Sequence, residues 1–170
     1  VLYIMSLKIS KIRGNIDDKN YIEKIKNLKN LPQGIENSLK TEELIQIFAK
    51  DFLSAKGSMF LGRGSSFPIA LEGALKLKEL SYLHAEGYPA GEMKHGPLAL
   101  IEDGLPVIIL APKDKYFEKT ISNMQEVIAR GGKVLLISDK HDEVINENIR
   151  FKIEMPFIDE LLNPFLLTVP

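Results

Sequence analysis

Cysteine and tryptophan are absent from this 170-residue chain, and histidine occurs only three times. Without cysteine this chain can form no disulfide and no thiolate metal site, and it has no cysteine nucleophile. The composition fits a reducing cytoplasm. Any catalysis must therefore use carboxylates, lysines or the histidines. The spacing of His84 and His95 is unlike that of a zinc motif, so we expect no metal and no cofactor.

An excess of charge of either sign is also lacking, because the formal net charge is −1. Such a chain has no long-range field to attract nucleic acid or an anionic membrane, so an anionic ligand needs a local site. The apolar stretch 1–12 is interrupted by Lys8 and Lys11 and is too short to span a bilayer. We expect no nucleic-acid partner, no membrane segment and a cytoplasmic location.

The composition that is present, 45% hydrophobic and 26% charged residues, is typical of one soluble α/β domain. Short apolar runs predict strands at 58–61, 106–111, 133–138 and 151–155, with helical patterns at 68–83 and 116–130 between them. Alternating strands and helices predict a parallel sheet covered on both faces. The expected fold is a flavodoxin-like, three-layer αβα sandwich of about four strands, which binds ligands at the carboxyl ends of the strands.

Helices are expected ahead of the first strand. The pattern at 1–13 predicts the end of a buried helix closed by Gly14, and 17–30 predicts a second helix. Pro32 should open another short helix, and Thr41 should cap the next one. The chain begins inside a helical pattern and stops after an apolar, periodic segment, so we expect an internal fragment of a longer protein.

Three charged residues form one stripe on the helix expected at 68–83. Glu72, Lys76 and Glu79 fall within about 60° of each other on a helical wheel whose remainder is largely apolar. Charges in such a setting lie near a cleft or an interface, where their pKa values can shift toward those useful for proton transfer. The alternative is an ordinary i, i+4 surface pair worth a few tenths of a kcal/mol.

The segment 84–97 is dense in histidine, glutamate, glycine and proline and lies between two clear elements, which is typical of a binding loop. Within it, His95 follows Lys94, and a neighbouring cation should favour a neutral imidazole able to take or give a proton. A hydrogen-bonded loop histidine without a chemical role is the alternative. His141 lies in a polar turn and is assigned no function.

A glycine loop at 62–66 follows the first strand and precedes a helix, an arrangement that can hold a phosphate at the helix N-terminus. However, no Walker lysine follows, and a GxGxxG fingerprint is incomplete. The loop after the strand at 106–111 has no serine or threonine cluster. As a phosphate clamp this part of the chain looks incomplete.

Four segments, FLGRG at 60–64, ALEGALKLKE at 70–79, HAEGY at 84–88 and GEMKHGPLAL at 91–100, closely resemble the second sugar-isomerase (SIS) domain of the glucosamine-6-phosphate synthases. The similarity extends over nearly the whole chain. The resemblance implies that 1–40 is the end of a preceding SIS domain with a helical connector. Residues 41–170 would then be the second SIS domain, truncated at its C-terminus.

The family makes glucosamine 6-phosphate from fructose 6-phosphate and ammonia taken from glutamine, by a ketose–aldose isomerisation. By motif match, Glu79 is expected to move a proton between C1 and C2, and His95 to act as the acid/base that opens the sugar ring. Glu72 and Lys76 match supporting site residues.

The resemblance also implies a homodimer with a composite site, because the histidine serves a site whose other residues come largely from a second subunit. Arg63 and Gly64 are the expected loop contacts. The first SIS domain with its phosphate loops, the C-terminal lysine and the glutaminase domain have no counterpart in this sequence. We therefore expect little substrate affinity and no synthase activity from the chain alone.

Two other readings remain open at this point. One is an SIS deglycase or isomerase that acts without glutamine. The other is a non-catalytic SIS module that senses sugar phosphates, which would need no proton shuttle. A buried Glu79 would argue for the enzyme rather than the sensor.

Overall fold

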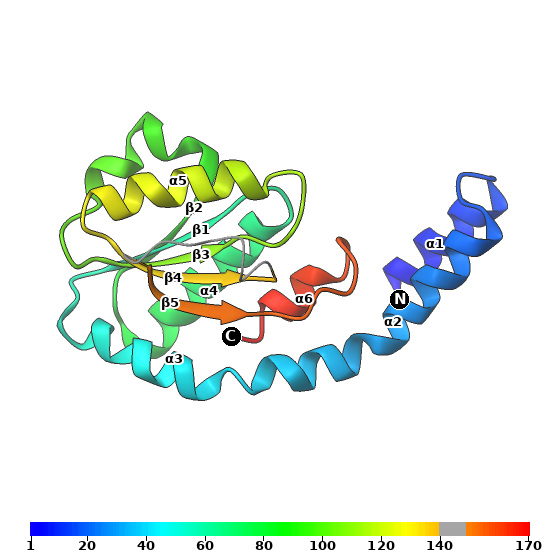
Figure 1. Ribbon diagram of the computed structural model, residues 1–170, viewed down its shortest axis with the longest axis horizontal. Helices are drawn as coiled ribbons and strands as arrows, with labels where there is room; N and C mark the ends of the chain where they lie inside the picture. The colour runs from blue at the N-terminus through cyan, green and yellow to red at the C-terminus, as the bar shows by residue number, and fades with distance from the viewer. Residues whose placement is uncertain (140–148) are drawn as a thin grey trace.

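The computed structural model describes residues 1–139 and 149–170 and shows a parallel sheet between two layers of helices, with a helical arm at the N-terminus (Figure 1). The helices are α1 (Leu2–Ile12), α2 (Asp18–Leu39), α3 (Glu42–Ala49), α4 (Ser66–Ser81), α5 (Phe117–Ala129) and α6 (Asn163–Leu167). The strands are β1 (Ser58–Gly62), β2 (Ala85–Pro89), β3 (Pro106–Leu110), β4 (Lys133–Ser138) and β5 (Ile149–Glu154). Short 3-10 helices are η1 (Lys50–Ser54), η2 (Ala90–His95) and η3 (Pro97–Leu100).

The five described strands are all parallel and lie in the order β2-β1-β3-β4-β5. This confirms the expected flavodoxin-like sandwich, with one strand more than the sequence indicated. The chain leaves β1 toward one edge and then returns to the other side of β1 to form β3. The crevice at this reversal, outside the carboxyl ends of β1 and β3, is where such sheets bind ligands.

Side chains alternate between the two faces of the sheet and build two separate cores. On one face Met93 of η2 and Met124 of α5 pack against Leu61 and Leu136. On the other face, residues of α3, α4 and α6 meet the alternate strand positions, for example Ile108. The central strands β3 and β4 are buried almost throughout, as expected for a sheet covered on both faces.

Strand β2 lies within the segment that the sequence indicated as a loop. It is an edge strand of five residues that contains Gly87 and ends at Pro89, so it lacks the apolar run of a central strand. Gly87 is required by close packing, since a Cβ there would lie 2.9 Å from the backbone of Leu71 in α4. The sequence of β2 has a weak strand signal, although this strand makes a close contact with α4 through Gly87.

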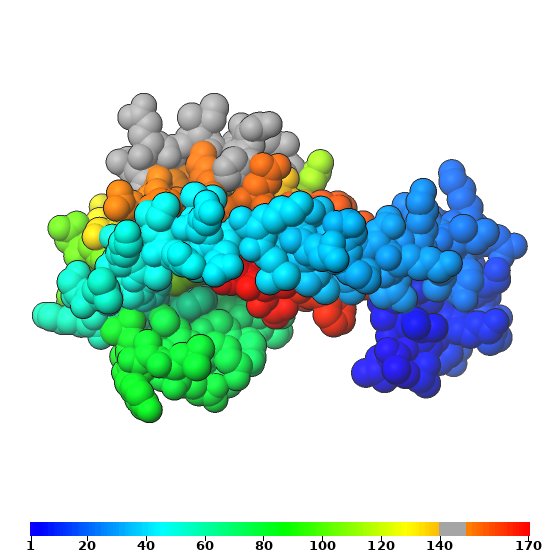
Figure 2. All heavy atoms as spheres, turned by 90° about the horizontal axis from the view of Figure 1, so that it is seen from below, coloured from blue at the N-terminus to red at the C-terminus, as the bar shows by residue number. Residues whose placement is uncertain are grey.

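The N-terminal region also differs from expectation. α2 is one helix that contains Pro32, rather than two helices. Its second half is held by close packing, because a Cβ at Gly34 would lie 2.6 Å from Ile158 and 3.0 Å from Leu166 of α6. α1 ends near Gly14 as expected, but it is largely exposed, with only Leu7 buried. α1 and the first part of α2 project from the body as an arm (Figure 2).

Thr41 is the N-cap residue of α3, as predicted, but its side chain does not cap the helix. The Thr41 hydroxyl donates to the carbonyl of Ser38 at 2.7 Å and makes no capping bond to α3. Within the described ranges, no helix combines the length and the hydropathy needed to cross a membrane.

Candidate functional site

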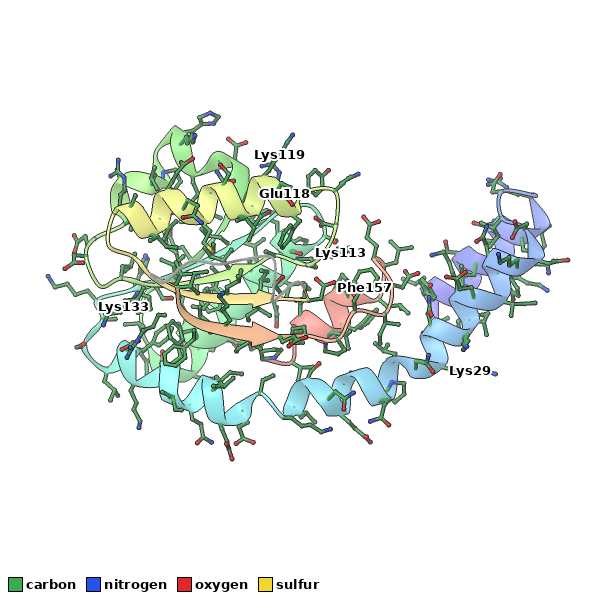
Figure 3. The ribbon with its side chains drawn as sticks, in the orientation of Figure 1. Lys29, Lys113, Glu118, Lys119, Lys133 and Phe157 are labelled. Atoms are coloured by element: carbon green, nitrogen blue, oxygen red, sulfur yellow. The ribbon has the colours of Figure 1, made fainter. Side chains whose placement is uncertain are left out.

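The reversal crevice is formed by the loops that follow β1 and β3. The Arg63 guanidinium lies 5.4 Å from the centroid of the Tyr116 ring. Gly64 has a φ of +57°, and a Cβ there would lie 2.6 Å from the Tyr116 ring. A glycine is therefore required where the two loops meet, and Tyr116 covers the glycine loop. In Figure 3, Lys113 lies at this carboxyl end of the strands and Lys133 at the opposite end of the sheet.

The start of α4 has few backbone amides left to hold a phosphate. The amide of Ser66 donates to the Arg63 carbonyl at 3.1 Å, and the amide of Phe67 donates to the Gly64 carbonyl at 3.2 Å. The next residue, Pro68, has no N–H to offer. The first three residues of α4 therefore offer no free amide to an anion. The geometry agrees with the incomplete clamp indicated by the sequence.

Two carboxylates at the same edge were missed by the sequence analysis. Asp139 follows β4 and accepts from the amide of Lys113 at 2.5 Å, and Asp114 accepts from the amide of Tyr116 at 2.7 Å. Burial raises the pKa of Asp114 above its ordinary value, and the nearby charge of Glu160 adds to the shift. The position of Asp139 directly after an apolar strand was the available signal. Negative groups here oppose binding of a phosphate.

The charged stripe of α4 exists as an ion-pair chain. The Lys76 Nζ lies 2.9 Å from the Glu79 Oε2 and 3.6 Å from the Glu72 Oε1. The side chains are 51–54% exposed, so the expectation of a buried Glu79 is wrong for this chain. The hydrogen bond to Glu79 raises the pKa of Lys76, away from neutrality rather than toward it. In this geometry Lys76 is a fixed cation and not a proton donor near pH 7.

The stripe borders a large apolar groove of about 790 Å³ on the same face of the sheet. Its lining includes Phe48 and Phe52 from the α3–η1 segment, Phe60 from β1 and the last four residues of the chain. Glu72 and Lys76 lie among the lining residues of α4. In Figure 2, cyan α3, green α4 and the red C-terminal residues lie near one another on the molecule. Its apolar floor suits hydrophobic side chains and does not match a sugar phosphate.

His95 ends η2 and carries an exposed imidazole. Its Nδ1 lies 2.7 Å from the Glu92 Oε2. The expected neighbouring cation does not face the ring, because the Lys94 Nζ pairs instead with the Glu126 Oε1 at 2.8 Å. The partner of His95 is therefore a carboxylate, and the expectation that a cation lies beside the ring is wrong.

The predicted site residues fall in three places. Glu72, Lys76 and Glu79 lie on α4, whose Ala70 packs into one core, whereas His95 follows Met93, which packs into the other. The sheet therefore separates Glu79 from His95. Because α4 begins at Ser66, Glu79 also lies about 20 Å along the helix axis from the glycine loop.

Arg63 is closer to the His95 segment than to the stripe. A Cβ at Gly91 in η2 would lie 3.0 Å from the Arg63 Nη1. One copy of the chain thus presents the histidine and the α4 stripe as two separate surfaces. Among the residues the structure describes, no three histidine, aspartate or glutamate side chains are grouped to hold a metal ion; His141 lies outside the described residues.

These features define the class of the chain. The model of the SIS domain family matches residues 51–168, so the chain belongs to the SIS domain family. It is 46% identical over 170 residues, 99% of its length, to the glutamine–fructose-6-phosphate aminotransferase (isomerizing) of Bartonella quintana, of which it covers 28%. The corresponding enzyme of Aquifex aeolicus is 44% identical over 99% of this chain, which covers 27% of that protein.

A solved structure shows the same relationship. The C-terminal domain of glucosamine-fructose-6-phosphate aminotransferase from Francisella tularensis superposes with a TM-score of 0.92 and is 40% identical; the match covers 99% of this chain and 47% of that one. The resemblance found in the sequence is confirmed. The chain spans a little over a quarter of the length of the curated relatives it matches.

Proposed function

We propose that the chain is the second SIS domain of a glutamine–fructose-6-phosphate aminotransferase (isomerizing), which converts fructose 6-phosphate and ammonia to glucosamine 6-phosphate in the cytoplasm. The observation that carries the proposal is 44–46% identity to these aminotransferases over essentially the whole chain. In this proposal residues 1–40 are the end of the preceding SIS domain and a connector, and 41–170 are the second SIS domain.

Glu79 is proposed as the base that moves a proton from C1 to C2 of the imine formed by ammonia and the open-chain sugar. A carboxylate is suited to this transfer, and the ion pair with Lys76 fixes its position on α4. Glu72 holds the other side of Lys76. His95 is proposed to open the sugar ring, with Arg63 and Gly64 as contacts from the neighbouring loop.

We propose further that the active site is shared between two copies in a homodimer. The separation of Glu79 from His95 by the sheet supports this arrangement, because one copy cannot direct both side chains at one sugar. The phosphate is proposed to be held elsewhere, since the amides of Ser66 and Phe67 are used within the turn and Pro68 has no amide hydrogen. The first SIS domain is proposed to supply that clamp, and the glutaminase domain to supply the ammonia.

The test is a chimera in which this chain replaces the matching segment of the Bartonella quintana enzyme. The proposal predicts glucosamine 6-phosphate formation by the chimera, and a loss of at least ~100-fold in kcat for Glu79→Gln. The matched control Glu102→Gln, an exposed glutamate away from the stripe, should keep full activity. A thermal unfolding curve and a size-exclusion profile like those of the unmodified Bartonella quintana enzyme report that the grafted segment has folded.

A folded chimera that releases ammonia but makes no product would overturn the proposal. Titration of the isolated chain with fructose 6-phosphate provides a second test, and weak binding or none is expected. Tight binding by the chain alone would favour the sugar-phosphate sensor, since a sensor must hold its own ligand.

A further inference from the structure

The 3-10 helix η2 is fixed to the body of the protein from two directions. Ala90 and Met93 are fully buried. The side-chain nitrogen of Asn123 in α5 donates to the Ala90 carbonyl at 3.1 Å. In the same amide orientation it also donates to the Lys119 carbonyl. Lys94 pairs with Glu126, also on α5. The backbone that carries His95 is therefore rigid, although the imidazole itself is exposed.

Only one side of η2 is left for chemistry. Residues three apart lie above one another in a 3-10 helix, so Glu92 and His95 share the side that faces away from the core, while Met93 faces inward. The 2.7 Å separation between the Glu92 Oε2 and the His95 Nδ1 is that of a charge-assisted hydrogen bond. A neutral imidazole has one donor and one acceptor nitrogen, and its partner selects which is which.

We propose that Glu92 is a positioning residue for His95. The carboxylate can only accept, so Nδ1 must carry the proton and donate it to Glu92. This leaves the lone pair on Nε2 and turns Nε2 toward solvent. The inference rests on the proposed function, in which His95 opens the ring of the sugar phosphate.

The proton balance of that step follows from the tautomer. Nε2 accepts the proton of the anomeric hydroxyl, the bond between C2 and the ring oxygen breaks, and the C2 carbonyl forms. The ring oxygen then takes the proton back from Nε2. Without the bond to Glu92, an imidazole that carries its proton on Nε2 presents no base to the hydroxyl.

A second histidine serves as an internal contrast. In the pair formed by His84 and Glu86, the nitrogen that faces the carboxylate is Nε2, at 3.4 Å, and the Tyr88 hydroxyl donates to the other Glu86 oxygen. The two pairs have the same residue types but opposite ring nitrogens. The ring nitrogen that faces the carboxylate is therefore set by the local geometry of each pair and not by the residue types.

Long-range ¹H–¹⁵N correlation spectra of the ¹⁵N-histidine-labelled chain test the tautomer directly. The neutral His95 ring should carry its proton on Nδ1. In Glu92→Ala this preference should be lost, and in Glu92→Gln, which keeps the shape without the charge, it should weaken. Glu102→Ala should leave the His95 signals unchanged. An Nε2–H ring in the unmodified chain, or unchanged signals in Glu92→Ala, would overturn the inference.

Kinetics of the chimera then separate positioning from stability. Glu92→Ala should lower kcat about 10- to 100-fold with KM nearly unchanged and with the same thermal unfolding curve. Unchanged kcat in Glu92→Ala would overturn the positioning role even if the tautomer changes. An inactive chimera that carries the unmodified segment would contradict the proposed function, and Glu92 would then have no catalytic role. An active chimera in which Glu92→Ala leaves the His95 tautomer unchanged would contradict only the inference about Glu92.

Discussion

Glu79 and His95 lie on opposite faces of the sheet, one on a helix that packs into the core around Phe48 and the other on a 3-10 helix that packs into the core around Met124. Each has a carboxylate or ammonium partner on its own element, Lys76 for Glu79 and Glu92 for His95. The two groups proposed for one reaction are therefore positioned independently, which is why the proposal places them in a site shared between two copies.

The turn between β1 and α4 depends on Gly62. A Cβ at this position would lie 2.3 Å from the carbonyl oxygen of Ser66, a backbone atom that cannot move away cheaply. Gly62→Ala should lower the free energy of unfolding by about 3 kcal/mol, measured by urea denaturation.

Gly14→Ala is the matched control. Gly14 has a φ of +70° but open space around its Cβ position, so this variant should lose only about 1 kcal/mol through backbone strain. Equal losses at the two positions would contradict the steric explanation for Gly62.

An ion pair holds the arm to the body: the Lys24 Nζ of α2 lies 2.7 Å from the Asp159 Oδ2. The Asp159 side chain is only 8% exposed, so Lys24→Met leaves a poorly hydrated carboxylate without its cation. We expect a loss of about 1–3 kcal/mol, measured by urea denaturation at neutral pH. The double variant Lys24→Met, Asp159→Asn should recover most of it; no recovery would show that the loss comes from elsewhere.

The same pair has a defined dependence on alkaline pH. The hydrogen bond to Asp159 raises the pKa of Lys24 above its ordinary value of 10.5. The stabilisation is therefore fully present below pH 10.5 and is lost as the pH rises through the pKa of the folded state. The stability difference between the natural chain and Lys24→Met should shrink over that range, and a constant difference would contradict the assignment.

Asp114 should have the opposite influence at the carboxyl edge of the sheet. Burial raises its pKa above 3.8 in the folded state, so the folded chain binds the proton more tightly than the unfolded chain. Stability therefore falls as the pH rises from about 3.8 through the pKa of the folded state. Asp114→Asn should melt at a higher temperature than the natural chain at pH 7, and the difference should disappear below pH 3.8. A lower melting temperature at pH 7 would contradict this sign.

Strong local signals made much of the fold predictable. Runs such as 106–111 are apolar throughout because both faces of a central parallel strand are buried, and they indicated β3 and β4 correctly. β2 was missed because an edge strand with Gly87 and Pro89 owes its position to pairing with β1 and to α4. Pro32 was taken as a helix start because the packing of Gly34 on Ile158 is a tertiary contact that the local sequence does not reveal.

The candidate site was predictable in its residue types but not in its environment. The wheel placed Glu72, Lys76 and Glu79 on one stripe, and the observed ion pairs agree. It could not show that this stripe faces an open groove, because the burial of a helix face depends on what covers it. The prediction that Lys94 faces the His95 ring was wrong because adjacent residues in a 3-10 helix point in different directions. Lys94 pairs with a glutamate of α5, and Glu92 contacts the ring.

The most direct test of the shared site mixes two inactive variants of the chimera, Glu79→Gln and His95→Asn, and measures glucosamine 6-phosphate formation after subunit exchange. If each site takes Glu79 from one copy and His95 from the other, a mixed dimer keeps one intact site, and activity should return to about one quarter of that of the unmodified chimera. If both residues of one chain serve the same site, the mixture stays as inactive as its two components, and the account of a site divided by the sheet is wrong.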